Sequence, residues 1–473
     1  MSELGQKEQR KTEDIYLQAA DWQLNTGGQK IVAKRLTGRF RTLKWLGMLT
    51  WLPFFLGPYI RWNGQQAILF DLPNRQYHFF DITVYPQDIW MLALTLVFFA
   101  ILLAVVTSVA GRVFCGYFCF QTVWTDIFTF IEGKCEGETP SKSSKFNASP
   151  WTLNKLKRKT MKHGLWLVVA MLTGISFTAW FTDAFQLWHD YLTLEAAMPA
   201  WIALGVFTTG TYILAGFMRE QVCLWLCPYA RIQSVMVDQD TILPHYDVQR
   251  GEPRAKLRKS QPRQDNGSCV DCKLCVAVCP TGIDIRQGQQ LGCITCGLCI
   301  DACDDIMTKT NQSTGLIRYA SHKEIHDDAE PVAYYKRPRV LVYTLIMLLA
   351  LSGIVSGLSG LSPAEFNVLH ERQPLFVRLS DGAIQNKYVL KLLNKTQQAM
   401  TVQFGITGIE GATLHQAEAR SIEPGKVMAI TVFVRLPESR IQSDITPLTF
   451  IGKVQNQPDI DLIYQSMFLA PKH

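Results

Sequence analysis

Five apolar segments constrain the fold of this 473-residue chain more than any other feature. A helix needs about 20 mostly apolar residues to cross a bilayer. A soluble protein can bury one helix of this kind, but five in one chain predict a membrane protein. The predicted spans are 43–60, 89–111, 164–185, 197–218 and 340–360.

The basic residues between these segments predict the orientation of the chain. Lys and Arg are concentrated in 1–42, 112–163 and 219–339, and they are scarce or absent in 61–88 and 186–196. Connections rich in Lys and Arg stay on the cytoplasmic side of the membrane. We therefore expect the first three ranges in the cytoplasm, and the other two, with the C-terminal tail, outside. The net charge of +7 is then largely a topology signal, which argues against nucleic-acid binding.

The cysteine distribution agrees with this orientation. All 13 cysteines lie between positions 115 and 303, on the predicted cytoplasmic side, and the tail has none. Free thiols are typical of a reducing compartment.

Two cysteine runs predict a pair of iron–sulfur clusters. "CVDCKLCVAVCP" at 269–280 and "CITCGLCIDACD" at 293–304 share the spacing C-x2-C-x2-C-x3-C. In ferredoxins with two [4Fe–4S] clusters, the fourth cysteine of each run binds the other cluster. A structural zinc site is the alternative, but it takes only four ligands. The predicted ligands are Cys269, Cys272, Cys275 and Cys303 for the first cluster, and Cys279, Cys293, Cys296 and Cys299 for the second.

Two further cysteine pairs lie at predicted cytoplasmic ends of spans. Cys115 and Cys119 follow the second span, and Cys223 and Cys227 follow the fourth. If each stretch is helical, residues i and i+4 place both sulfurs on one face. Four thiolates that meet would bind a soft ion such as Cu(I), zinc or an iron–sulfur centre. The alternative is that these cysteines are small buried apolar residues. Cys135 has no partner at helical spacing, and we expect it to be incidental.

Other redox and catalytic motifs are missing from the sequence. None of the nine histidines lies in the middle of a predicted span, which argues against a transmembrane haem held by paired His. There is no Gly-rich dinucleotide fingerprint, P-loop or nucleophile elbow. Single-electron transfer is the only chemistry that the sequence indicates, and it identifies no catalytic residue.

Residues 362–473 have a different character. Runs such as "VMAITVFVRLP" are rich in β-branched residues, and turn signals such as "SDG" and "EPG" separate them. Several short strands with turns between them predict a β-sandwich.

These motifs together resemble the CcoG/FixG/RdxA family of cytochrome c oxidase accessory proteins. The resemblance covers nearly the whole chain and includes the double cysteine run. Its other matching stretches are "CGYFCFQTVWTDIFTFIE" (115–132), "REQVCLWLCPYARIQSVMVDQDTI" (219–242), "YDVQRGEPR" (246–254) and "RLSDGAIQNKYVLKLLNKT" (378–396).

The resemblance implies a multi-pass protein of the bacterial inner membrane. Its fold would combine an α-helical transmembrane bundle of about five spans, a cytoplasmic ferredoxin-like module with two [4Fe–4S] clusters and an immunoglobulin-like β-sandwich. The expected parts are a cytoplasmic tail (1–42), transmembrane helices 1–4 (43–218) with cytoplasmic loop 112–163, a cytoplasmic segment (219–339) with the ferredoxin module at about 262–310, transmembrane helix 5 (340–360) and a periplasmic sandwich (362–473).

The resemblance also implies a function in assembling cbb3-type cytochrome c oxidase. The family is linked to copper delivery through reduction of Cu(II) to Cu(I), which makes cupric reductase the candidate enzymatic activity. Cys115, Cys119, Cys223 and Cys227 would be the copper or redox thiols, and oxidase subunits or copper-handling assembly factors the partners. The family pattern has C-x3-C-P at both sites, whereas Phe120 follows the first pair here.

Two other functions fit the same motifs. The protein could be a general polyferredoxin subunit that feeds electrons to a respiratory reductase, and it would then need no copper. It could also be a non-catalytic assembly scaffold, in which case oxidase assembly would survive the loss of cluster ligands. The sequence does not indicate the electron donor.

Overall fold

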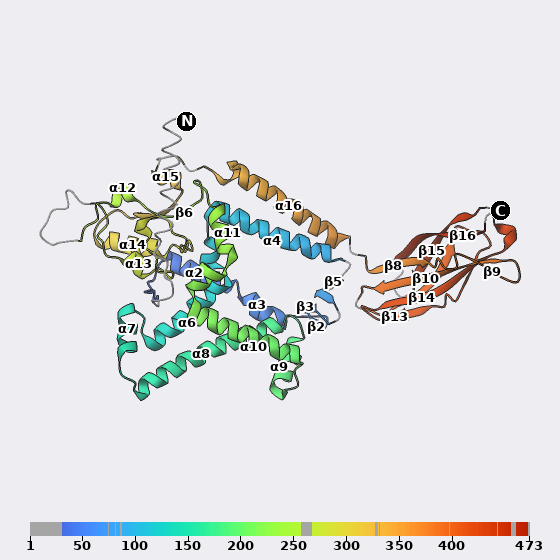
Figure 1. Cartoon of the computed structure of the whole chain (residues 1–473), viewed down its shortest axis with the longest axis horizontal. Coiled ribbons are helices and arrows are strands. Elements are labelled where there is room, and N and C mark those ends of the chain that lie inside the picture. The colour runs from blue at the N-terminus through green and yellow to red at the C-terminus, as the bar shows by residue number, and fades with distance from the viewer. Residues whose placement is uncertain are drawn as a thin grey trace. The chain divides into compact units, whose positions relative to one another are not determined.

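The computed structural model describes residues 31–471, apart from 74, 81, 86–87, 257–266, 327–329, 331, 361, 397, 442 and 456–459. Most of the predicted N-terminal tail, residues 1–30, therefore lies outside the described residues. The chain forms two compact units (Figure 1). One contains the residues up to Tyr59 together with Ala93–Ser352, and the other contains Ile60–Leu92 and the residues from Gly353 onward.

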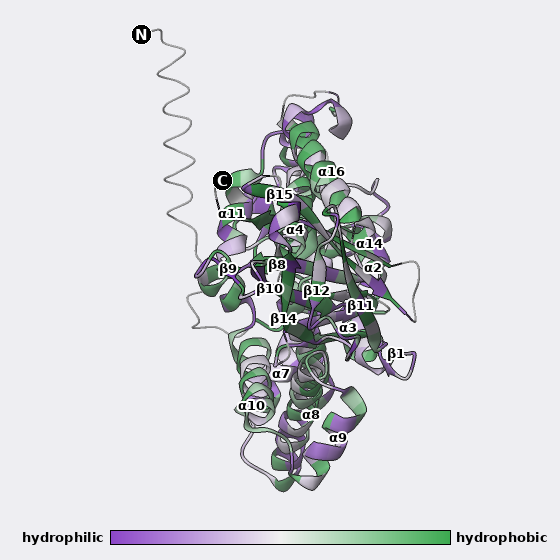
Figure 2. Cartoon of the chain, turned by 90° about the vertical axis from the view of Figure 1, so that its right-hand side faces the viewer, coloured by the Kyte–Doolittle hydropathy of each residue, from purple (hydrophilic) through white to green (hydrophobic). Residues whose placement is uncertain are grey.

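Four helices among the described residues are long and apolar enough to cross a membrane. Figure 2 shows hydrophobic residues along α10 and α16, and most of the apolar surface of α4 and α16 is exposed. The four helices are α4 (Ile89–Ala110), α8 (Leu153–Thr178), α10 (Met198–Ile213, continued by the π-helix η3, Leu214–Met218) and α16 (Pro338–Ser359).

The predicted first span, 43–60, is not a single helix. It is divided between α2 (Arg39–Leu49) and α3 (Leu52–Leu56), and a 3-10 turn, η1 (Gly57–Tyr59), follows. Pro53 has no backbone N–H and so cannot continue the hydrogen-bond ladder of α2. An 11-residue helix is about 16 Å long, which is too short to span a bilayer. The count of five spans therefore stays a prediction.

The predicted loop 112–163 is mostly helical. Helix α8 begins at Leu153, well before the predicted span 164–185, because the Thr152 hydroxyl caps it by accepting from the Lys155 N–H. His163 thus lies inside this helix, where its Nδ1 is 2.8 Å from the Tyr212 hydroxyl. The predicted external connection 186–196 is likewise mostly helical. The helices are α5 (Val113–Tyr117), α6 (Phe120–Glu136), α7 (Pro140–Ala148) and, after α8, α9 (Ala184–Thr193).

Small residues let the long helices approach one another closely. A β-carbon added at Gly174 of α8 would lie 3.1 Å from the Leu204 carbonyl oxygen of α10. Helices α4 and α16 are antiparallel neighbours: Arg337 donates to the Ser108 carbonyl at 3.5 Å near one end, and Gly357 packs against Trp90 near the other. Close packing at small residues is typical of helices in membranes.

The segment after α10 forms the cysteine-rich module. Strands β6 (Leu243–Tyr246) and β7 (Ile317–Ala320) pair antiparallel and bring its two ends together. A small core that includes Tyr246, Met307 and Leu316 lies beneath the cysteines. The helices are η4 (Val222–Leu226, a π-helix), α11 (Pro228–Met236), α12 (Val248–Gly251), α13 (Leu274–Ala277), η5 (Ile285–Gln287), α14 (Leu298–Lys309), α15 (His322–His326) and η6 (Tyr334–Lys336).

The C-terminal region is the predicted β-sandwich. Its two antiparallel sheets have the orders β12-β14-β10-β8, with β9 beside β10, and β13-β11-β15-β16. The Tyr388 side chain is fully buried between them and donates a hydrogen bond to the Met467 carbonyl at 2.9 Å. The strands are β8 (Ala364–His370), β9 (Val377–Arg378), β10 (Ile384–Asn394), β11 (Met400–Thr407), β12 (Thr413–His415), β13 (Arg420–Ile422), β14 (Val427–Leu436), β15 (Ile445–Val454) and β16 (Asp461–Leu469).

The connection 61–88 packs on this sandwich. Lys395 forms an ion pair with Asp88 at 3.1 Å, and Gln76 donates to the Gly425 carbonyl at 3.2 Å. The connection and the sandwich therefore belong to one compact unit, and their common side of the membrane stays a prediction from the charge pattern. Which side is the cytoplasm stays a prediction. The strands of this connection are β1 (Arg61–Trp62), β2 (Gln65–Gln66), β3 (Ile68–Asp71), β4 (Gln76–Phe79) and β5 (Ile82–Val84).

Candidate iron–sulfur and thiol centres

The two cysteine runs have the same backbone conformation. Asp271 and Lys273 have φ of 48° and 57°, and the equivalent Thr295 and Gly297 have φ of 54° and 71°. Helices α13 and α14 start directly after the second of these residues. The left-handed conformation costs about 1–2 kcal/mol for a residue with a β-carbon, and such residues cluster at ligand sites. Each run therefore bends twice and turns its cysteines around a common centre.

The structure gathers the eight cysteines of the two runs around two small cavities. Each cavity is lined by three cysteines of one run and the fourth cysteine of the other, and Cys275 lies between the cavities and lines both. These are the two sets that the ferredoxin pattern predicts. The first cavity has Cys269, Cys272, Cys275 and Cys303, and the second has Cys279, Cys293, Cys296 and Cys299.

The spacing of these thiols suits clusters better than single ions. Among the described residues, no three His, Cys, Asp or Glu side chains are close enough to hold one metal ion. A zinc ion needs four ligands at about 2.0–2.3 Å, which brings the sulfurs nearly into contact. A [4Fe–4S] cubane is larger, and each of its irons takes one thiolate. The thiol sets therefore fit two cubanes, which supply one-electron transfer when bound.

Burial makes two thiols of the first set poorly acidic in the absence of iron. It raises the pKa of Cys275 and of Cys303 to about 12, so both thiols are neutral at physiological pH. Cluster binding must then displace protons. Arg286 offsets part of this effect at Cys275, and it is held by ion pairs to Asp271 at 2.7 Å and Asp284 at 2.6 Å.

Hydrogen bonds join the loop that lines the second cavity to α5, the helix that contains Cys115. The Tyr117 hydroxyl of α5 donates to the Cys296 carbonyl at 2.9 Å, and the Arg112 N–H donates to Thr295 Oγ1 at 3.2 Å. On the other side of the loop, the Tyr319 hydroxyl donates to the Thr295 carbonyl at 2.7 Å. The ligand loop of the second cavity is thus held at its backbone.

Neither C-x3-C pair lies on one α-helix, so the expected i, i+4 geometry is wrong. Cys115 is in α5 and Cys223 is in η4, but Cys119 and Cys227 have extended backbone beyond those helices. In each pair the N–H of the second cysteine bonds a carbonyl five residues earlier, at 2.9 Å and 2.8 Å. The wide turn arises because the second cysteine of each pair leaves its helix and occupies the residue position just before the next helix. Single wide turns of this kind are frequent at functional sites.

The residue after each pair has the same structural position. Phe120 and Pro228 are the first residues of α6 and α11, each directly after an extended cysteine. Proline is favoured at this position because a backbone N–H there would be unpaired, and proline has none. Pro228 therefore begins a helix, and it does not end or kink one. Phe120 instead stacks on Trp124, with ring centroids 4.1 Å apart, so its replacement of proline leaves the turn intact.

The four thiols of the two pairs lie near one another. Burial raises the pKa of Cys115 to about 11 and that of Cys223 to about 12, and repulsion from the other thiolates of the set adds to both shifts. Arg112 is the cation that opposes these shifts. Cys135 stands outside this set, buried in α6.

Helix α5 also packs directly on the second-cluster loop. A β-carbon added at Gly116 would lie 2.5 Å from the Ile294 carbonyl oxygen and 3.3 Å from the β-carbon of Cys296. Cys115 shares one buried cluster with Ile294 and Cys296. The thiol site and the second cavity are therefore immediate neighbours.

Sequence reasoning missed the polar residue that supports this thiol site. Gln233 is completely buried, and its Oε1 accepts from the Cys115 thiol and from Arg112 Nε, both at 3.2 Å. A lone glutamine in α11 carries no spacing signal, and only the fold brings it to Cys115.

The comparisons with known proteins assign iron–sulfur domains to both regions. Residues 218–322 match the 4Fe-4S dicluster domain, and residues 92–135, which contain Cys115 and Cys119, match a 4Fe-4S binding domain. Residues 354–471 match the immunoglobulin-like fold at the C-terminus of FixG.

Curated relatives match almost end to end. The nitrogen fixation protein FixG of Rhizobium meliloti is 38% identical over 489 aligned residues, covering 94% of this chain and 93% of FixG. This chain belongs to the FixG/RdxA family. Protein RdxB of Cereibacter sphaeroides is 39% identical and covers 86% of this chain. Membership of the FixG/RdxA family confirms the resemblance seen in the sequence and makes this a membrane-associated iron–sulfur electron-transfer protein.

One solved structure is similar to part of this chain. The FixG-related protein from Vibrio parahaemolyticus is 24% identical, covers 24% of this chain and all of that structure, and has a TM-score of 0.22.

Proposed function

We propose that this protein passes electrons through two [4Fe–4S] clusters to the four-thiol site, where Cu(II) is reduced to Cu(I). The observation that carries this proposal is the contact between α5 and the second-cluster loop, at Gly116 and Ile294. Copper is the substrate: each Cu(II) gains one electron, and the cluster that supplies it is oxidised by one electron. Thiolates favour the soft Cu(I) product.

The biological use that we propose is assembly of cbb3-type cytochrome c oxidase, which needs copper. This step rests on the resemblance to the CcoG/FixG/RdxA family, and the partners would be oxidase subunits or copper-handling assembly factors. The clusters and thiols would face the cytoplasm and the sandwich the periplasm, because the basic connections lie with the clusters.

The test compares the wild-type protein with a variant that lacks all four thiols of the copper site. After anaerobic reduction with dithionite and removal of excess reductant, Cu(II) is added and Cu(I) is captured with a coloured chelator. We expect the rate to fall at least tenfold in Cys115→Ala/Cys119→Ala/Cys223→Ala/Cys227→Ala and to stay unchanged in Cys135→Ala. Iron should remain near about eight atoms per chain in all three.

Two outcomes would contradict the copper assignment. Equal Cu(II) reduction by the four-thiol variant would show that these cysteines are not the copper site. Iron near about twelve atoms per chain in the wild type, falling by about four in the variant, would place a third cubane there.

The contact at Gly116 gives a second prediction. Gly116→Ala should slow Cu(II) reduction about tenfold with both clusters retained, because the added β-carbon forces α5 away from the second-cluster loop. Gly133→Ala is the control, since its added β-carbon would meet neighbours only at 3.7 Å or more. Stopped-flow mixing with Cu(II) gives the rate, and EPR of the reduced protein verifies the clusters. Equal rates for the two variants would argue against electron transfer across this contact.

A second candidate function is electron supply to a respiratory reductase. The observation that favours it is similarity to the ferredoxin-type protein NapH of Haemophilus influenzae, 23% identical over 46% of this chain. That name indicates ferredoxin-type chemistry and gives no acceptor. On this alternative the reduced protein would not convert Cu(II), and oxidase assembly would not depend on the four thiols.

A further inference from the structure

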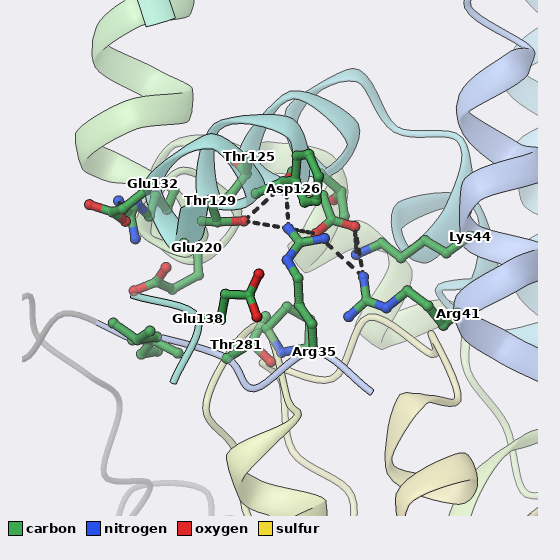
Figure 3. A pocket seen from close by; sticks show the side chains of 18 of the residues that line it. Arg35, Arg41, Lys44, Thr125, Asp126, Thr129, Glu132, Glu138, Glu220 and Thr281 are labelled. Carbon is green, nitrogen blue, oxygen red and sulfur yellow. Dashed lines mark hydrogen bonds and ion pairs between the residues drawn. The ribbon is translucent and has the colours of Figure 1, made fainter. Parts of the chain in front are cut away.

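A polar cavity of about 300 Å³ lies beside the thiol site (Figure 3). Its walls come from residues 31–45, α6, Cys223 and the loop after Cys279. Thr281 in that loop lines the cavity, and its hydroxyl is 3.3 Å from the Cys279 sulfur. A molecule in this cavity would therefore sit next to a candidate copper thiol and to a residue that contacts a candidate ligand of the second cluster.

Two arginines that line the cavity have a buried nitrogen without a partner. Arg35 uses Nη2 to bind Asp126 at 2.6 Å, and Arg219 uses Nη2 to bind Glu132 at 2.6 Å. Nη1 of each side chain is buried and donates to no atom in the part of the chain that the structure describes. Leaving a buried donor unpaired costs about 1–3 kcal/mol. The cavity wall thus contains two cationic side chains with spare hydrogen-bonding capacity, which favours a ligand that carries oxygen acceptors.

A second, apolar cavity has a volume of about 430 Å³. Gln121 lines both cavities and is the residue that their walls share. The apolar cavity is bounded by α8 and α10, two of the helices long enough to cross a membrane. Aromatic side chains form much of its wall, namely Trp51, Phe54, Phe120, Phe177 and Phe207.

The pair of cavities specifies an amphipathic ligand. Its head must carry oxygen acceptors and fit within about 300 Å³, and its tail must be a hydrocarbon reached from the membrane. A nicotinamide or flavin dinucleotide has no such tail, and the sequence lacks the Gly-rich segment that would bind its phosphates. The neighbouring thiols and clusters indicate a ligand that exchanges electrons. A lipid-soluble quinone meets all of these conditions.

We propose that the two cavities bind a quinone, with its ring in the polar cavity and its tail in the apolar one, and that its hydroquinone form reduces the clusters. The hydroquinone loses two electrons and two protons to become the quinone. One electron passes to each of two oxidised clusters, and the protons pass to the lining carboxylates Glu138 and Glu220 and then to solvent. The electron step rests on the proposed function, whereas binding of the quinone does not.

The first test is photolabelling of the full-length protein in detergent with an azido-quinone that carries a decyl tail. Cross-linked peptides should map to residues 31–45, 119–138 or 206–223, and unlabelled decylquinone should compete. Gly210 lines the apolar cavity and a β-carbon there meets nothing within 4 Å, so Gly210→Leu should fill the cavity and lower labelling at least fivefold. Gly205→Leu is the matched control, because Gly205 is in the same helix with equally open space but does not line the cavity.

Arg35→Gln is a second variant, for use if Gly210→Leu does not fold. In Arg35→Gln, the concentration of decylquinone that halves the labelling should rise about tenfold. Labelling that is equal in the wild type and both variants, or that maps elsewhere, overturns the proposal. Competition by phosphatidylglycerol as effective as that by decylquinone overturns it too, since the cavities would then be a phospholipid site.

Anaerobic mixing of the cluster-loaded protein with decyl-hydroquinone tests the electron step. The EPR signal of reduced clusters should appear in the wild type and in Gly205→Leu and be lost in Gly210→Leu, although dithionite reduces all three. Labelling without reduction would overturn the donor role and leave the binding site in place. Failure of dithionite-reduced protein to convert Cu(II) would instead refute the proposed function and would not touch the quinone site.

Discussion

Replacing Cys296 with alanine should lower the iron content by about four atoms per chain and abolish electron transfer to the four-thiol site. Cys296 lines the second cavity, and it is buried against Cys115 in the same apolar cluster. A cubane bound by three thiolates leaves one iron without its protein ligand, and the substitution also removes the sulfur nearest to α5. Iron analysis, EPR of the reduced protein and the rate of Cu(II) reduction measure the three effects.

Cys135→Ala is the control for this experiment. Cys135 is equally buried, but it lies in α6 outside every cysteine set. Its replacement should therefore leave iron content and electron transfer unchanged. Loss of iron from both variants to the same extent would show that the effect follows from a damaged fold. Unchanged iron in Cys296→Ala would remove this residue from the predicted ligands.

Asp126→Asn should destabilise the protein by about 3–5 kcal/mol. The Asp126 carboxylate is buried in α6, where it is 3.2 Å from Arg41 Nη1 and 3.1 Å from Lys44 Nζ and also pairs with Arg35 (Figure 3). Lys44 is 1% exposed, so the substitution would leave a buried cation without its counter-ion. Thermal unfolding in detergent, followed by circular dichroism, measures the change. Asp305→Asn, in an exposed pair with Lys309, should cost less than about 1 kcal/mol.

The same carboxylate predicts a dependence of stability on pH. Burial raises the pKa of Asp126, but the three cations lower it more and leave it at about 2, below the ordinary value of 3.8. A carboxylate with a lowered pKa stabilises the fold above pH 4 and loses this contribution as the pH falls from 4 to 2. The loss is about 2 kcal/mol. Asp126→Asn should show no such loss between pH 4 and pH 2. If this variant unfolds in acid as the wild type does, the loss of stability does not come from Asp126.

The parts predicted from sequence are those that depend on local patterns. The spacing of the two cysteine runs predicts which cysteines share a cavity, because the fourth cysteine of each run, Cys303 on α14 and Cys279 just after α13, reaches the other centre. Alternating β-branched runs predict the sandwich, and continuous apolar runs predict α4 and α16. The segment predicted as the first span is divided between two helices near Pro53, so its crossing of the membrane stays a prediction.

Contacts between segments far apart in the chain could not be predicted from such local patterns. The four thiols lie near one another through wide turns and not through the expected helical face, although no three of them in the described structure are close enough to hold one metal ion. Gln233 and Asp126 carry no motif, and their importance comes only from the side chains that surround them. The two cavities that share Gln121 likewise take their walls from helices and loops far apart in the chain.

The sequence by itself determined the chemistry of this protein: thiols at ferredoxin spacing, apolar segments for a membrane and a family that combines them. These properties depend on residue type and on short covalent separations, which a sequence states directly. The tertiary structure alone decided that α5 rests on the second-cluster loop, so that the thiol site has a cluster as its neighbour. That contact depends on the absence of a side chain at Gly116 and on the packing of segments far apart in the chain, and no local pattern encodes it.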